Sequence, residues 1–191
     1  MTFADAVRPS WKWRSSKLLY DSSLVLGGSL LVALSAGVAV RLPFSPVPIT
    51  GQTLAVLLVG MVMGAKRGAL SLVLYLAEGA MGLPVFAGGG LGIVWMTGPT
   101  GGYLLGFVVA AFVVGVLAER GWDRRVYSAA LALLVGNAVI YLLGLPWLAR
   151  FTGAEQVLQA GLFPFLVGDI LKVVLAMLAL PVAWRYLPSK R

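Results

Sequence analysis

Two side chains of opposite charge lie three residues apart in a stretch that is otherwise apolar. The stretch GLFPFLVGDILKVVLAMLALP, residues 161–181, contains Asp169 and Lys172 as its only ionisable groups. At this spacing the two side chains share one face of a helix and can form an ion pair. An ionisable side chain at mid-bilayer costs about 2.5–3.5 kcal/mol on insertion scales. The pair therefore indicates either a structural ion pair between helices or a pocket that holds water or a ligand, and both interpretations stay open at this point.

Further polar residues are predicted at a similar depth. Asn137 lies near the middle of the apolar segment LLVGNAVIYLLGLP, and Glu78 lies near the end of LYLAEGAMGLP, where it either lines a pocket or caps a helix. Thr50, Gln52 and Tyr103 enter the same level from loops and helix ends. A few directed polar groups among apolar walls are typical of a small-molecule site. Apolar walls are expected from nearby aromatic residues: Phe86, Trp95, Trp147, Phe163 and Phe165.

The composition shows what kind of scaffold holds these residues. The chain of 191 residues is 60% hydrophobic and 12% charged, with a mean hydropathy of +0.93, whereas soluble domains are roughly 45–50% apolar and about 25% charged. A polytopic membrane protein with a single domain is therefore predicted over residues 1–191. The net charge of +8 is spread between apolar segments and not along one face, so a nucleic acid partner is not expected.

The residues that are absent argue against enzyme chemistry. The chain has no cysteine and no histidine, which removes thiolate nucleophiles, the commonest metal ligand and the usual base near neutral pH. No G-x-x-x-x-G-K-[ST] phosphate loop is present. A membrane enzyme would need a Ser–Lys or carboxylate scheme, and Lys172 has no evident serine facing it. We expect no metal, no cofactor and no catalytic residues.

The fold class predicted is an all-α membrane protein with six transmembrane helices, since a spanning helix needs roughly 20 apolar residues. The predicted spans are 22–42, 52–65, 68–82, 100–118, 126–146 and 163–187. The second and third are short and are expected to form one hairpin around residues 65–68. Residues 1–21, which mix Trp, Tyr, Lys and Arg, are predicted to be an interfacial segment at the cytoplasmic face of the cell membrane.

The loops predict the orientation of the spans. One side carries twelve basic residues: Arg8, Lys12, Arg14, Lys17, Lys66, Arg67, Arg120, Arg124, Arg125, Arg185, Lys190 and Arg191. The other side carries Arg41 and Arg150 alone. By the positive-inside rule both termini are cytoplasmic, in agreement with an even number of spans.

Three outer segments are long, apolar and rich in Gly and Pro: residues 43–53, 82–103 and 145–164. Irregular backbone is tolerated at membrane depth only where it is buried in protein or lines a cavity. These segments are therefore predicted to be lids or re-entrant loops that close a ligand pocket, with compact turns at the headgroup level as the alternative.

Five stretches carry a family resemblance: PVPITGQTLAVLLVGMVMG, YLAEGAMGLPVFAGG, GPTGGYLLGF, IYLLGLPWL and GLFPFLVGDILK. In their order and spacing, from about residue 24 to residue 187, they resemble the biotin-specific substrate-binding (S) component of energy-coupling factor (ECF) transporters, the BioY family. The resemblance implies six helices, cytoplasmic termini and capture of a vitamin on the outer side. It also implies two kinds of partner, a transmembrane coupling subunit and ABC ATPases.

The resemblance assigns ligand contacts to the G-D-x-x-K motif and a pocket wall or roof to the G-P-T-G-G-Y and P-I-T-x-Q-T stretches. Asn137 and Glu78 are added from their depth and chemistry. The ligand-binding candidates are thus Asp169, Lys172, Asn137, Glu78, Tyr103, Gln52, Thr50 and Gly98.

The predicted function is high-affinity biotin capture and uptake as an S component, energised by partner ATPases. The alternative is a stand-alone or ion-coupled carrier for a small vitamin-like molecule. The family's A-x-x-x-A-like docking motif is matched in size by Ala33-x-x-x-Gly37, preceded by Ser29; this stripe of small residues serves either partner docking or internal packing. Some relatives carry an Arg near the loop glycines where this chain has Gly88–Gly90, so the partner of the ligand's carboxylate is left open, as is the end of biotin that faces Lys172.

Overall fold

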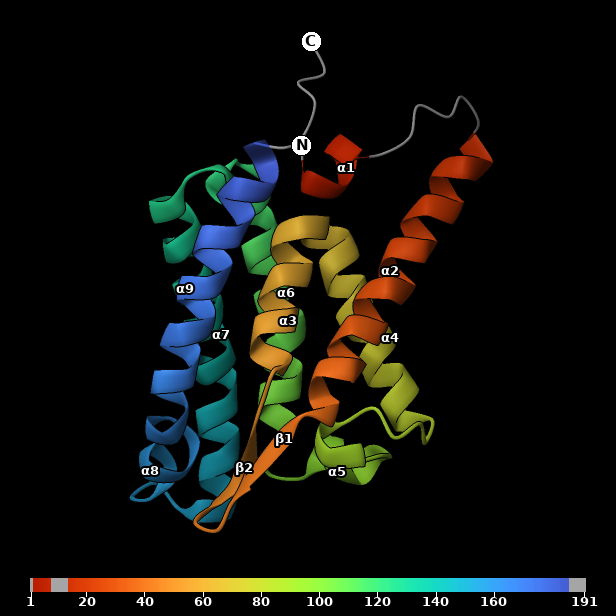
Figure 1. Cartoon of the computed structure of the whole chain (residues 1–191). Coiled ribbons are helices and arrows are strands. Elements are labelled where there is room, and N and C mark those ends of the chain that lie inside the picture. Colours follow the sequence, from red (N-terminus) through yellow and green to blue (C-terminus); the bar gives the residue numbers. More distant parts are fainter. Residues whose placement is uncertain (1, 8–13, 186–191) are drawn as a thin grey trace.

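The apolar segments of the chain fold into a bundle of helices that is closed at one end by a β-hairpin and short helical turns (Figure 1). The structure is a computed structural model that describes residues 2–7 and 14–185. Its helices are α1 (Phe3–Val7), α2 (Arg14–Gly37), α3 (Gln52–Met63), α4 (Ala65–Ala80), α5 (Ile93–Thr97), α6 (Gly101–Glu119), α7 (Val126–Thr152), α8 (Val157–Gly161) and α9 (Phe163–Arg185). Two 3₁₀ turns, η1 (Ala87–Gly89) and η2 (Trp122–Arg124), and two strands, β1 (Ala39–Leu42) and β2 (Ser45–Thr50), complete the described elements.

Four helical segments are long and apolar enough to cross a membrane: Lys17–Gly37, Gly101–Glu119, Val126–Thr152 and Val157–Arg185. The prediction of a mostly helical membrane protein is confirmed at this level. Helix α3 has 12 residues and α4 has 16, which correspond to about 18 and about 24 Å, short of a hydrocarbon core of about 30 Å. The number of six spans stays a prediction.

The first predicted span is wrong at its outer end. Helix α2 stops at Gly37, and residues 39–42 form β1, which pairs antiparallel with β2. Pro46 and Pro48 lack the N–H that a helix needs and restrict the residues before them to extended conformations. The predicted outer segment 43–53 is therefore a hairpin arm, and the description of the fold as all-α needs this correction.

The third predicted outer segment, residues 145–164, is mostly helical. Helix α7 continues through Pro146 to Thr152, and α8 follows at Val157. A proline is tolerated inside a membrane helix where neighbouring groups satisfy the freed backbone. Segment 82–103, in contrast, is largely irregular and contains η1 and α5 before α6 begins.

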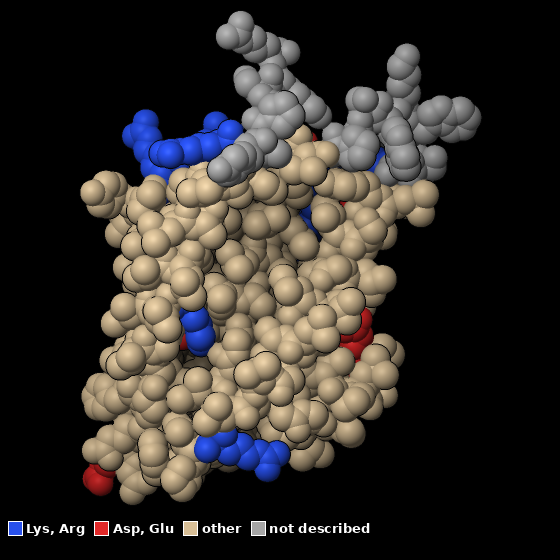
Figure 2. Space-filling view, viewed as in Figure 1, with Lys and Arg blue, Asp and Glu red and all other residues tan. Residues whose placement is uncertain are grey.

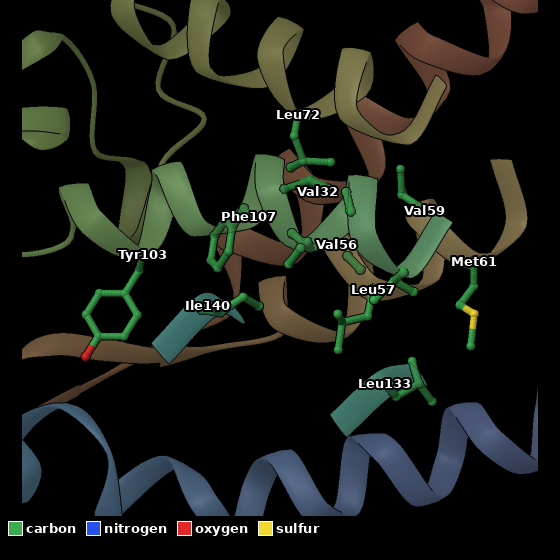
Figure 3. Close-up of a cluster of buried hydrophobic side chains, with 14 of the residues drawn as sticks. Val32, Val56, Leu57, Val59, Met61, Leu72, Tyr103, Phe107, Leu133 and Ile140 are labelled. Carbon is green, nitrogen blue, oxygen red and sulfur yellow. The ribbon is translucent and has the colours of Figure 1, made fainter. Parts of the chain in front are cut away.

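Side chains from α2, α3, α4, α6 and α7 form the core (Figure 3). Helices α3 and α4 pack as the predicted hairpin, with the turn at Gly64, whose φ of +86° favours glycine. Tyr103, Phe107 and Ile140 lie at one end of the buried cluster in Figure 3. The site described below begins at this end.

The opposite end of the bundle carries α1 and the C-terminal end of α9 (Figure 1). Figure 2 shows Lys and Arg gathered at this end, above a middle belt that is mostly uncharged. Helix α1 is bound there because Arg67 pairs with Asp5 at 2.7 Å and with Asp21 at 2.9 Å. Residues 8–13, including Trp11 and Trp13 of the predicted interfacial segment, and residues 186–191 lie outside the described residues.

Candidate binding site

The two charges of the C-terminal stretch meet on one face of α9. Asp169 is 6% exposed, and the Lys172 Nζ lies 3.2 Å from the Asp169 Oδ1. The i, i+3 spacing produces this contact, because one helical turn separates the two side chains. The ion pair predicted from the spacing is therefore present.

Lys172 also connects α9 to the hairpin and to α3. Its Nζ donates to the Thr50 backbone carbonyl at 2.9 Å and to the Thr53 Oγ1 at 2.7 Å. Thr50 is the last residue of β2, and Thr53 lies in the first turn of α3. An ammonium group has three N–H donors, so these two contacts and Asp169 occupy all of them.

Asp169 accepts hydrogen bonds from three side chains. Its Oδ1 accepts from the Thr53 hydroxyl at 3.2 Å and from Lys172, and its Oδ2 accepts from the Tyr141 hydroxyl of α7. A carboxylate offers about four lone-pair positions, so Asp169 keeps acceptor capacity at Oδ2. A ligand bound beside it would be recognised through an N–H or O–H donor.

A cavity of about 50 Å³ lies beside this ion pair. Its lining is mainly aromatic and aliphatic and comes from β2, α3, segment 82–103, α6, α7 and α9. The lining residues are Val47, Pro48, Thr50, Gln52, Thr53, Phe86, Ala87, Trp95, Thr100, Tyr103, Leu104, Phe107, Ile140, Tyr141, Phe165, Asp169 and Lys172. Ligand pockets usually measure about 300–1,000 Å³, so this cavity is smaller than a typical ligand pocket.

Hydrogen bonds connect the segments at the outer end of the bundle. The Ser45 hydroxyl of the hairpin donates to the Ala160 carbonyl of α8 at 2.6 Å, and the Tyr103 hydroxyl donates to the Gly161 carbonyl at 2.9 Å. Gln52 donates to the Tyr75 hydroxyl at 2.7 Å, and that hydroxyl donates to the Val85 carbonyl at 3.1 Å. These contacts place the hairpin and segment 82–103 over the cavity.

The structure brings five of the predicted ligand-binding residues together in this lining: Thr50, Gln52, Tyr103, Asp169 and Lys172. It places the other three elsewhere. Glu78 accepts a hydrogen bond of 2.5 Å from the Ser29 hydroxyl, between α4 and α2, and Gly98 accepts from the Trp147 indole at 2.9 Å. Asn137 is 8% exposed, and its Oδ1 has no partner among the described residues. As ligand contacts these three stay predictions.

Of the aromatic residues expected to form walls, Phe86, Trp95 and Phe165 line the cavity and Trp147 and Phe163 do not. Two hydroxyl groups donate to Asp169, those of Thr53 and Tyr141. Sequence reasoning did not identify Tyr141, and it included Thr53 only as a member of the P-I-T-x-Q-T stretch. Thr53 follows Gln52 directly, and Tyr141 lies one helical turn beyond Asn137 in the same apolar segment. The polar neighbours of these residues are visible in the sequence, but the sequence does not show which group each hydroxyl contacts.

The small-residue stripe on α2 turns from the inside of the bundle to its surface. Ser29 is completely buried and bonded to Glu78, so its role in the structure is internal packing. Ala33 is partly buried against the core, and Gly37 is exposed with open space where a Cβ would lie. Docking of a partner at Ala33 and Gly37 stays a prediction.

The fold and the site define a class, that of helical membrane proteins with a buried ion pair beside an apolar cavity near one end of the bundle. The chain belongs to the BioY family, whose sequence model matches residues 10–189. A probable biotin transporter BioY of Pyrococcus horikoshii is 44% identical over 151 residues, 78% of this chain and 89% of that protein. The biotin transporter BioY of Rhizobium etli is 36% identical over 176 residues, 86% of this chain and 94% of that protein.

A solved structure has the same fold. The crystal structure of the S-component for biotin from an ECF-type ABC transporter matches with a TM-score of 0.79, covers 92% of this chain and 95% of that chain, and is 22% identical. At this identity the match establishes the arrangement of the helices. The names of the relatives describe transporters, in agreement with the prediction that this chain is not an enzyme.

Proposed function

We propose that this protein captures biotin from outside the cell membrane and takes it up as the S component of an ECF transporter. One observation carries the proposal, the buried Asp169–Lys172 pair beside an apolar cavity under a lid, in a chain of the BioY family. The ureido ring of biotin offers two N–H donors, which suit the remaining acceptor capacity of Asp169. Its thiophane ring and valeryl chain suit the aromatic and aliphatic lining.

Ligand binding is coupled to the lid through Lys172. Because its Nζ bonds both Asp169 and the Thr50 carbonyl, a ligand that contacts this ion pair acts directly on the end of β2. Transport further requires a transmembrane coupling subunit and ABC ATPases as partners, since this chain has no phosphate loop. With six spans, both termini would lie in the cytoplasm.

Isothermal titration of the purified protein with biotin tests the site. Lys172→Ala and Asp169→Asn are each expected to weaken binding at least tenfold, which is about 1.4 kcal/mol. Lys66→Ala is the matched control, because this exposed lysine lies in the first turn of α4 and does not line the cavity. Unchanged affinity in both site variants would exclude the pair from the binding site.

The alternative is a stand-alone or ion-coupled carrier. Proteoliposomes that contain this protein alone are expected to take up no biotin against a gradient, and addition of the coupling subunit, the ATPases and ATP is expected to start uptake. Uptake without these partners that depends on an ion gradient would favour the carrier instead.

A further inference from the structure

A second hollow of about 220 Å³ adjoins the binding cavity on the side of the hairpin. Its lining residues are Ala39, Arg41, Leu42, Ser45, Pro46, Pro48, Ala87 and Trp95. Pro48, Ala87 and Trp95 belong to both linings. The hollow and the cavity therefore adjoin across these three side chains.

Arg41 is placed in this hollow by an irregularity in the hairpin. Val40 pairs with Ile49 and Leu42 pairs with Ser45, so the register shifts at Arg41. Such bulges re-aim a side chain relative to the regular pleat. The Arg41 Nη2 lies 3.5 Å from the position that a Cβ would occupy at Gly88, where φ is +65°. The guanidinium therefore lies close to Gly88 of η1.

The guanidinium of Arg41 is available to a ligand. Within residues 2–7 and 14–185, it forms no ion pair within 4.0 Å and no side-chain hydrogen bond. The other basic residue predicted on this side, Arg150, stacks over the Trp147 ring at 5.0 Å. A guanidinium has five N–H donors in a planar fork that matches the geometry of a carboxylate.

The two ends of the site therefore differ in what they can bind. Beside α9, the Lys172 donors are occupied and Asp169 offers a spare acceptor, so a ligand N–H is favoured there and a second carboxylate would be repelled. Beside the hairpin, Arg41 offers positive charge and unused donors. A ligand with N–H groups at one end and a carboxylate at the other matches this polarity in a single orientation.

We propose that the hollow around Arg41 is a carboxylate subsite, in which the Arg41 guanidinium binds the ligand's carboxylate while the N–H-bearing ring lies against Asp169. The inference rests on the proposed function and deepens it, because it assigns an orientation to biotin. It also supplies a positive partner for the carboxylate from the hairpin, in a chain that has only glycines at positions 88–90.

Titration with two ligands tests the subsite: biotin and its uncharged primary amide. Wild-type protein is expected to bind the acid at least tenfold more tightly than the amide. Arg41→Ala should weaken binding of the acid about tenfold and leave binding of the amide within twofold, so the preference disappears. Arg41→Lys, which keeps the charge without the fork, should retain part of the preference. Arg150→Ala is the matched control and should retain all of it.

The outcomes separate this proposal from the proposed function. Equal binding of acid and amide by the wild type overturns the subsite and leaves biotin capture intact, even if no Arg41 variant folds. Equal weakening of both ligands in Arg41→Ala overturns it as well, because Arg41 would then only support the hairpin. Loss of the preference in Lys172→Ala and not in Arg41→Ala reverses the orientation. Binding of neither ligand by the wild type contradicts biotin capture itself.

Discussion

At the scale of single residues, the site depends on a buried carboxylate that is nearly satisfied by its own protein. Thr53, Tyr141 and Lys172 supply three donors to Asp169. Burying a charge is costly unless it is paired and hydrogen-bonded, and these contacts satisfy the buried carboxyl group and fix its orientation. What remains for a ligand is a single directed acceptor, which favours selectivity for an N–H donor.

Removal of the Tyr141 hydroxyl should therefore weaken ligand binding without abolishing the site. Tyr141→Phe is expected to reduce biotin affinity several-fold, because Asp169 Oδ2 loses its donor and the carboxylate is free to reorient. Titration of the variant beside Tyr127→Phe, whose ring is 86% exposed on the same helix, provides the measurement and the control. Equal affinity in both variants would contradict this role.

At the scale of elements, the β-hairpin connects the binding site to the outer surface. The end of β2 is bound by Lys172, and its start is bound through the Ser45 hydroxyl to α8. The cavity between them is small, about 50 Å³, so we expect these contacts to loosen when a ligand enters or leaves. An isolated two-stranded sheet is at best marginally stable, so these contacts help to hold the hairpin in place.

Bound biotin should make the hairpin less mobile. The chain has no cysteine, so a single Cys introduced at Phe44, which is 63% exposed at the hairpin turn, takes one nitroxide label and leaves the Ser45 hydroxyl in place. The electron paramagnetic resonance spectrum is expected to broaden on addition of biotin. A label at Tyr127, on the first turn of α7, should give the same spectrum with and without biotin. Identical spectra at position 44 would argue against closure.

At the scale of the whole molecule, α1 joins helices at the end opposite to the lid. Asp5 binds Arg67 of α4, the Tyr20 hydroxyl of α2 donates to the Ala4 carbonyl at 2.7 Å, and Phe3 packs edge-on against Trp184 of α9. Burial raises the pKa of Asp5, but the hydrogen bonds from Arg67 and Thr2 outweigh it and bring the pKa below its usual value of 3.8.

This contact predicts a pH dependence of stability. Because the folded-state pKa of Asp5 is lowered, its contribution is present above about pH 3.8 and is lost as the pH falls through the folded-state value. Asp5→Asn should reduce the free energy of unfolding at pH 7 by no more than about 1 kcal/mol, because the ion pair is partly exposed. The thermal unfolding midpoint should fall accordingly. The difference from wild type should shrink as the pH falls below 3.8 and through the lowered folded-state pKa. Glu155→Gln, an exposed control, should show no such trend, and a constant difference for Asp5→Asn would contradict the assignment.

The sequence by itself determined the class of the protein, the positions of most apolar helices and the charged pair of the site. These features are local, since hydropathy accumulates along a segment and the i, i+3 spacing acts within one turn. Tertiary structure decided that residues 39–42 leave the helix to form a hairpin and that Ser29 and Glu78 pair away from the cavity. It also decided that Thr53 and Tyr141 line the cavity and that Arg41 lines the adjoining hollow. Each of these depends on contacts between segments far apart in the chain, and a local pattern of polarity does not specify which distant partner satisfies a buried group.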